Sequence, residues 1–154
     1  MKIFTLEPNG IYEEKYPNGQ LKRRINYANY LANGLTEMWH ENGQLKYRIN
    51  FKDGVEDGMF ECWDKNGNLN YRTTYKNGKK HGLYESFYES GKLWFRSNYK
   101  NGKYHGIWDS WYENGQLESR EIWKNNKEDG LWEKWDENGN LIESINYKNG
   151  KRID

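Results

Sequence analysis

The side chains that could carry out ionic or acid–base chemistry in this chain recur as pairs of one acid and one arginine. Each pair sits at the same place in one of five successive units, and the pairs are Glu13 with Arg24, Glu37 with Arg48, Glu61 with Arg72, Glu85 with Arg96, and Asp109 with Arg120. A catalytic constellation is unique within a protein, whereas opposite charges that recur in this way are typical of cross-strand ion pairs. We therefore interpret these residues as structural.

Three histidines and one cysteine are the other residues with chemical potential. His40, His81 and His105 are scattered over different units, and His81 and His105 share one repeat position. A metal site needs several ligands close together, and a nucleophilic cysteine needs a neighbouring base. Cys62 has no histidine in register, so we predict no enzyme, no metal and no cofactor.

Two series of glycines divide the chain into identical lengths. They return every 24 residues without an insertion, at Gly10, Gly34, Gly58, Gly82, Gly106 and Gly130, and at Gly19, Gly43, Gly67, Gly91, Gly115 and Gly139. A fixed period of this kind indicates a repeat architecture, in which each unit buries its apolar groups by stacking on its neighbours. Function is then expected on an extended surface.

Composition narrows the classes of partner. The 154 residues carry a net charge of +1, which gives no overall field to attract nucleic acid or an anionic membrane. Only 34% of the residues are hydrophobic, but 17% are aromatic, and large rings bury much area while keeping a polar handle in water. A single cysteine and the lack of an apolar secretory segment favour a cytoplasmic protein, unless a signal has been trimmed.

Turn signals predict the fold. The second glycine series follows Asn or Ser, and a further set of turn pairs comes half a unit later at Asn29-Tyr30, Asp53-Gly54, Asn77-Gly78, Asn101-Gly102, Asn125-Asn126 and Asn149-Gly150. Asn-Gly between alternating residues is typical of a two-residue type I′ hairpin. We predict an all-β protein, an elongated single-sheet antiparallel β-meander of tandem hairpin repeats, forming a twisted or curled open sheet.

One domain covers the whole chain, because no linker or change of composition interrupts the repeats. Residues 1–9 are predicted to form a leading half-unit, and residues 151–154 look like a short tail. The six hairpin repeats are predicted at 10–33, 34–57, 58–81, 82–105, 106–129 and 130–153.

Two-residue turns would fix the register on both sides of each strand. Across Asn66-Gly67 they place Glu61 opposite Arg72, and the other acid and arginine pairs follow in the same way. Across Asn77-Gly78 they place Tyr71 opposite Tyr84. Because side chains alternate along a strand, Glu85 and Phe87 fall on one face of the sheet, and Tyr84 and Phe95 on the other.

The residues resemble a known repeat family. Lys79-Lys80-His81-Gly82-Leu83-Tyr84 and Lys103-Tyr104-His105-Gly106-Ile107-Trp108 each follow Tyr-Lys-Asn-Gly and are similar to MORN repeats, more closely the variant found in bacterial proteins. The resemblance covers residues 9 to 150, although an Arg stands where the eukaryotic form tends to carry Gly. It implies a scaffold without catalytic activity that contacts proteins or phospholipids and dimerises, and bacterial members of the variant are often labelled antitoxin or immunity-like.

Aromatic residues that interrupt the repeat are the predicted binding residues. Trp94 is the one ring at its repeat position, where it is expected opposite Phe87. We predict an exposed patch of Trp63, Phe87, Trp94 and Trp111, with Trp39 and Trp135 at its ends, that anchors a partner. Variation at solvated sites is the alternative explanation.

The expected partner is another protein, either a toxin or a member of an assembly. The edge strands of an open sheet offer a second candidate surface, which would pair with a peptide strand or with a second copy of the chain. Carbohydrate or cell-wall binding and peripheral phospholipid binding are the alternative functions. No nucleic acid partner is expected.

Overall fold

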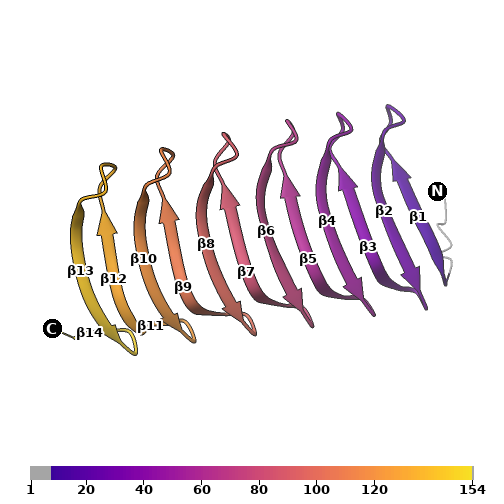
Figure 1. Cartoon of the computed structure of the whole chain (residues 1–154). Helices are drawn as coiled ribbons and strands as arrows, with labels where there is room; N and C mark the ends of the chain where they lie inside the picture. Colours follow the sequence, from indigo (N-terminus) through magenta and orange to yellow (C-terminus); the bar gives the residue numbers. More distant parts are fainter. Residues whose placement is uncertain (1–7, 154) are drawn as a thin grey trace.

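The structure, a computed structural model, describes residues 8–153 and consists of one antiparallel sheet (Figure 1). Neighbouring strands in the sheet are also neighbours in the chain, except that β11 and β12 both pair with β10. The strands are β1 (Gly10–Lys15), β2 (Leu21–Ala28), β3 (Leu31–Trp39), β4 (Leu45–Lys52), β5 (Val55–Trp63), β6 (Leu69–Lys76), β7 (Lys79–Phe87), β8 (Leu93–Lys100), β9 (Lys103–Trp111), β10 (Leu117–Lys124), β11 (Lys127–Glu128), β12 (Gly130–Trp135), β13 (Leu141–Lys148) and β14 (Lys151–Ile153). The predicted all-β, single-sheet meander is confirmed.

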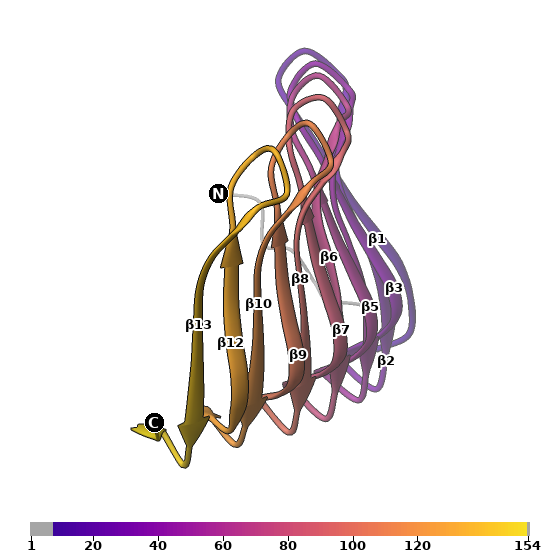
Figure 2. The ribbon, with the colours of Figure 1, turned by 60° about the vertical axis from the view of Figure 1, so that its left-hand side comes forward.

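The sheet is open and twisted, and its strands are bowed. β1 lies at one edge and β14 at the other, and no second layer of the described chain covers either face (Figures 1 and 2). Ile49 and Cys62 are the buried apolar residues of this part of the chain. The fold therefore depends on contacts between side chains that lie flat on adjacent strands rather than on an enclosed core.

The tight turns along one edge of the ribbon are the predicted type I′ hairpins. Both central residues have positive φ in each of them, for example Asn77 at 50° and Gly78 at 71°. Pairing continues directly to the turn, with Lys76 opposite Lys79. The residues before and after these turns therefore face each other as the sequence predicts.

The turns at the other edge differ from the prediction, since they are three-residue loops. At the loop after β5 the Asp64 amide donates to the Asn68 carbonyl at 2.9 Å, and the Gly67 amide donates to the Asp64 carbonyl at 3.2 Å. Gly67 has φ of +90° while Asn66 keeps an ordinary negative φ. This is the geometry of a type I turn followed by a glycine bulge, so the prediction of type I′ here is wrong.

A second irregularity compensates for the extra loop residue. Cys62 pairs with Tyr71 but Trp63 pairs with Leu69, so Asn70 is a β-bulge without a partner on β5. The three-residue loop shifts the register by one residue and the bulge shifts it back. For this reason Glu61 does lie opposite Arg72, as predicted, although the turn differs.

A wider irregularity surrounds the glycines of the first series from Gly34 to Gly130. Tyr75 pairs with Lys80 and Thr73 with Tyr84, so His81, Gly82 and Leu83 together face Thr74 alone. The Thr74 hydroxyl donates to the His81 carbonyl at 2.6 Å, which closes the gap in the backbone ladder.

This irregularity changes the predicted pairing of rings across the tight turns. Tyr71 lies opposite Ser86, and Tyr84 lies opposite Thr73, so the expected direct pair of Tyr71 and Tyr84 is wrong. The displacement is two residues, an even number, so the side chains on either side of this irregularity keep their predicted faces. The two rings still stack diagonally, with centroids 5.8 Å apart.

The ends of the chain differ from the prediction at one place. Residues 151–153 form β14, with Ile153 opposite Asn146, so they extend the sheet and are not a tail. The predicted leading half-unit at 1–9 lies outside the described residues except for residues 8 and 9, where the Pro8 carbonyl accepts a hydrogen bond of 2.9 Å from the Tyr30 amide.

Replacing Gly82 by alanine is expected to destabilise the sheet more than replacing Gly91. Both glycines have positive φ, at +92° and +80°, so each substitution carries a backbone penalty of about 1 kcal/mol. A Cβ on Gly82 would lie 2.8 Å from the Thr74 hydroxyl, whereas a Cβ on Gly91 meets nothing within 4 Å. We expect Gly82→Ala to cost about 2–3 kcal/mol of unfolding free energy in urea titrations, because it also disrupts the Thr74 hydrogen bond. Equal losses in the two variants would contradict this account of the irregularity.

Candidate functional site

One face of the sheet, here called the ladder face, carries the acid and arginine pairs. The side chain of Glu85 is 3% exposed and lies between Arg72 and Arg96. Arg72 Nε donates to Glu85 Oε2 at 2.7 Å, and Arg96 Nη2 donates to Oε1 at 2.7 Å. Burial would raise the pKa of the Glu85 carboxyl, but these hydrogen bonds outweigh it, so its pKa is held below the ordinary value.

The ion pairs join neighbouring hairpins as well as the two arms of one hairpin. Arg24 lies 2.8 Å from Glu13 in its own hairpin and 3.6 Å from Glu37 in the next. Arg48 bridges Glu37 at 3.5 Å and Glu61 at 3.7 Å in the same manner. The register predicted for all five pairs is confirmed, including Asp109 opposite Arg120 with 2.8 Å between Asp109 Oδ1 and Arg120 Nε.

Most of the predicted binding rings lie on the ladder face beneath these arginines. In each contact a guanidinium covers a ring at 5.6–5.9 Å from the ring centroid, in the pairs Arg24 with Trp39, Arg48 with Trp63, Arg72 with Phe87, and Arg96 with Trp111. Trp135 takes the equivalent place on β12 and is half-buried. These rings are spaced one per hairpin along the face and do not gather into one cluster.

Trp94 does not join them, and its predicted place opposite Phe87 is wrong. Phe87 pairs with Leu93, and Trp94 is the bulge residue of β8. The bulge turns Trp94 to the other face, where its ring lies 6.1 Å from Tyr88 and 6.5 Å from Phe95. Trp94 is 49% exposed, which makes it the most accessible of the predicted binding rings.

The face opposite the ladder, here called the aromatic face, carries a continuous row of rings. Successive centroids are 5.1–6.0 Å apart, and the row runs through Tyr47, Phe60, Tyr71, Tyr84, Phe95, Trp108 and Trp123. Such contacts are worth about 0.5–1.5 kcal/mol each beyond area burial. Burial among them raises the pKa of Tyr71 to about 12, and it also raises the pKa of Tyr84.

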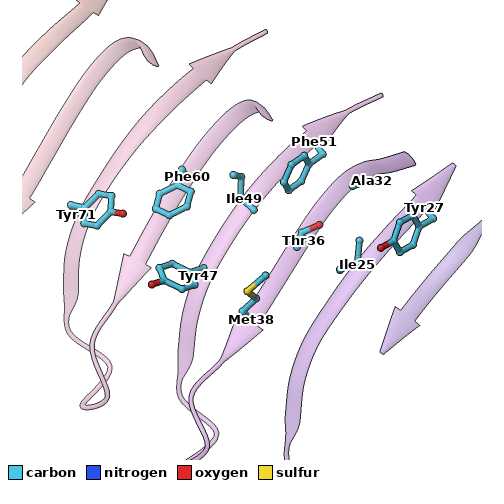
Figure 3. A pocket seen from close by; sticks show the side chains of 10 residues that line it. All are labelled: Ile25, Tyr27, Ala32, Thr36, Met38, Tyr47, Ile49, Phe51, Phe60 and Tyr71. Atoms are coloured by element: carbon cyan, nitrogen blue, oxygen red, sulfur yellow. The ribbon is translucent and has the colours of Figure 1, made fainter. Parts of the chain in front are cut away.

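Two hollows lie on the aromatic face. The first has a volume of about 490 Å³ (Figure 3), and its lining residues are Ile25, Tyr27, Ala32, Thr36, Met38, Tyr47, Ile49, Phe51, Phe60 and Tyr71. The second, of about 440 Å³, is lined by Lys80, Tyr84, Ser86, Trp94, Phe95, Tyr99, Tyr104 and Trp108. Sequence reasoning missed both, although the small residues Ala32 and Thr36 among the repeated rings were visible.

Lys80 and Glu121 are charged side chains that lie partly buried among rings of the aromatic face. Lys80 Nζ lies 4.6 Å from the Tyr84 ring centroid and 5.1 Å from that of Tyr99, and burial lowers the pKa of this lysine. Glu121 accepts hydrogen bonds from the indole nitrogens of Trp123 at 2.8 Å and Trp132 at 3.2 Å. Burial raises the pKa of Glu121 despite these bonds.

The histidines and the cysteine are dispersed. The His40 ring nitrogen lies 3.0 Å from the Trp63 carbonyl, and His81 lies 3.2 Å from the Asn101 side chain. Cys62 is buried, and burial raises the pKa of its thiol. Within residues 8–153, no three His, Cys, Asp or Glu side chains gather as metal ligands would.

Comparison with known protein families identifies the repeats. The family model described as MORN repeat variant matches residues 8–29, 32–53, 56–77, 80–101, 104–125 and 128–149. The chain belongs to this MORN repeat variant family. No curated protein matches the chain. Each matched segment ends at the first residue of a tight turn and has its three-residue loop in the middle.

One solved structure shows a distant likeness to this chain. It is a crystal structure of a GtfA/B complex bound to UDP and GlcNAc, with 12% identity and a TM-score of 0.33. The likeness covers 71% of this chain and 22% of that chain. In the described part of the MORN repeat variant protein, no helix has the length and apolar character needed to cross a membrane.

Glu85→Gln is expected to destabilise the protein by about 1–3 kcal/mol, because a buried carboxylate with two arginine partners is removed. Glu13→Gln is the matched control and should cost less than about 1 kcal/mol, since the Glu13 side chain is 41% exposed. Because the folded-state pKa of Glu85 is lowered, its stabilisation is present above pH 4.5 and is lost as the pH falls through the folded-state value. The difference between wild type and Glu85→Gln in thermal unfolding should therefore shrink below pH 4.5; a constant difference would contradict the assignment.

Tyr71→Phe is expected to protect the sheet at alkaline pH. The pKa of Tyr71 is raised from 10 to about 12, so the unfolded chain releases this proton before the folded chain does. Stability is therefore lost as the pH rises from 10 to 12, and removal of the hydroxyl should reduce the loss in melting temperature over that interval. Tyr30→Phe, at a ring that is 61% exposed, is the control and should follow the wild type.

Proposed function

We propose that this protein is a non-catalytic protein-binding module that holds its partner on the aromatic face, in the role of an antitoxin, an immunity protein or a scaffold. The observation that carries the proposal is the row of rings with two hollows on a sheet face that no second layer formed by residues 8–153 covers. Partly buried rings around apolar hollows are the features that bind protein side chains tightly. Membership of the MORN repeat variant family supports a repeat module of this kind.

The chemistry of the hollows favours a protein over a membrane or a sugar. The lining of the first hollow is mostly aliphatic and aromatic and includes no charged residue or amide; its polar groups are the hydroxyls of Thr36 and of three tyrosines. A net charge of +1 gives little attraction to an anionic lipid surface. An apolar side chain of a protein is the occupant that these walls suit.

The sheet edges are the second surface available for association. β1 and β14 each pair on one side only among residues 8–153, so their outer backbone groups can accept another strand. β14 has three residues, which gives a short edge. We place the principal contact on the aromatic face and treat edge pairing as a route to a homodimer.

Affinity purification with one variant on each face tests the proposal. Trp94→Asn truncates an exposed ring of the aromatic face to the residue that the chain itself carries at Asn70, the same repeat position. Met59→Gln replaces a side chain on the ladder face that is 46% exposed, and it serves as the matched control. Circular dichroism verifies that both variants fold.

A partner protein should be recovered from lysate of the source cells by the wild type and by Met59→Gln. Its recovery with Trp94→Asn should fall roughly 30-fold, the effect of losing a central ring from an interface. Recovery that depends on Met59 and not on Trp94 would overturn the choice of face. Binding to glycan arrays or liposomes in place of any protein would overturn the proposed function.

A further inference from the structure

The row of rings on the aromatic face is interrupted at one repeat. The repeat position that lies in the middle of the first strand of each hairpin is occupied by Tyr12, Thr36, Phe60, Tyr84, Trp108 and Trp132. Five of the six units carry a ring there, and the second unit carries threonine. Within the part of the chain that the structure describes, the row defined above starts at Tyr47 on β4, one strand beyond Thr36.

A second position on the same strand is also small in that unit. Ala32 lies opposite Tyr27 on β2, as Tyr104 lies opposite Tyr99 on β8. In the fifth unit Tyr104 and Trp108 stack with centroids 5.0 Å apart and fill the space above β9. Ala32 and Thr36 are too small to fill the corresponding space above β3, which creates the first hollow.

The walls of this hollow are apolar on both sides of β3. Ile25 and Tyr27 stand on β2, and Ile49 and Phe51 stand on β4, with the small side chains of β3 between them (Figure 3). Thr36 is 3% exposed, so the floor of the hollow is formed and does not need rearrangement. A preformed apolar hollow between ring-bearing walls has the chemistry of a socket for an aromatic side chain.

A cation without a counter-ion lies further along the same face. Lys80 on β7 lines the second hollow, and no ion pair among residues 8–153 includes it. The two rings that it contacts offer only partial negative charge. A partly desolvated ammonium gains most from a carboxylate that arrives with the partner.

We propose that the hollow over Ala32 and Thr36 receives an aromatic side chain of a protein partner, and that Lys80 pairs with a carboxylate of the same partner. This inference rests on the proposed function and specifies its partner. Four strand spacings separate β3 from β7, so the two anchors lie ~19 Å apart across the sheet. Glu121, further along the same face, would repel a carboxylate that docked beside it.

The hollow can be filled by substitutions that copy the residues found at the equivalent positions of another repeat. Ala32→Tyr combined with Thr36→Trp introduces the pair that the fifth unit carries as Tyr104 and Trp108, so the fold has a precedent for it. Thr36→Phe is a milder second variant that follows Phe60, and Thr36→Val is the control of nearly equal volume. Lys80→Gln removes the cation, and Lys79→Gln removes an exposed neighbouring one as its control.

Selection from a library of displayed random peptides tests the inference with a defined probe. Peptides of about 20 residues can span the two anchors as a helix or as an extended chain. The full chain is the target, and bound peptides are measured against each folded variant. Enriched peptides should contain Phe, Tyr or Trp together with Asp or Glu. They should bind the double variant and Thr36→Phe at least tenfold more weakly than the wild type and Thr36→Val.

Lys80→Gln should weaken the same peptides severalfold, and Lys79→Gln should not. Peptides that bind the filled variants as tightly as the wild type, peptides without acidic residues, or no enrichment at all would each overturn the inference. The probes are random peptides, so such a failure does not bear on the natural partner. The proposed function still stands if the wild type recovers a partner protein from lysate and Trp94→Asn does not. Conversely, hollow-dependent peptides with no partner protein in lysate would contradict the proposed function alone.

Discussion

The absence of a second layer over the described sheet is the constraint on which the rest of the structure depends. Apolar area can be removed from water only between side chains of adjacent strands, so each ring must cover a neighbour and be covered in turn. The row from Tyr47 to Trp123 meets this requirement on one face. On the other face, arginines such as Arg48 cover Trp63 with their guanidinium groups and hold acids on both sides. Both faces are thus stabilised by contacts that run across the strands.

The regular spacing of these contacts depends on three deviations from ideal pairing in each unit. A glycine bulge at the loop, a bulge residue such as Asn70 and the irregularity around Gly82 each shift the register and increase the local bend. The shifts of the loop and of the bulge cancel, and the irregularity around Gly82 shifts the register by two residues. The side chains beyond these deviations therefore keep alternating in phase between the two faces of the sheet. Identical deviations in successive units produce the bowed strands of the ribbon (Figure 2).

Much of this fold follows from the sequence, because the glycine period, the turn pairs and the pairing of Glu61 with Arg72 are local signals that tertiary contacts do not override. The loop type was missed because a two-residue turn and a three-residue loop with a bulge give the same register along most of each arm. The face of Trp94 was missed for the same reason, since the bulge that turns it over leaves no mark in the alternation pattern. The first hollow depends on what Ala32 and Thr36 fail to fill, and an unfilled volume is apparent only once their neighbours are placed.

Binding is assigned to the aromatic face of the sheet, and structural support to the ladder face. Methyl NMR of the full chain, with labelled isoleucine and methionine, tests this division directly during titration with the protein that co-purifies. We expect the methyl signals of Ile25, Met38 and Ile49, which line the first hollow, to shift on binding. Met59 and Ile107, both 46% exposed on the ladder face, should keep their positions. Shifts at Met59 and Ile107 with unchanged signals around the hollow would contradict the account.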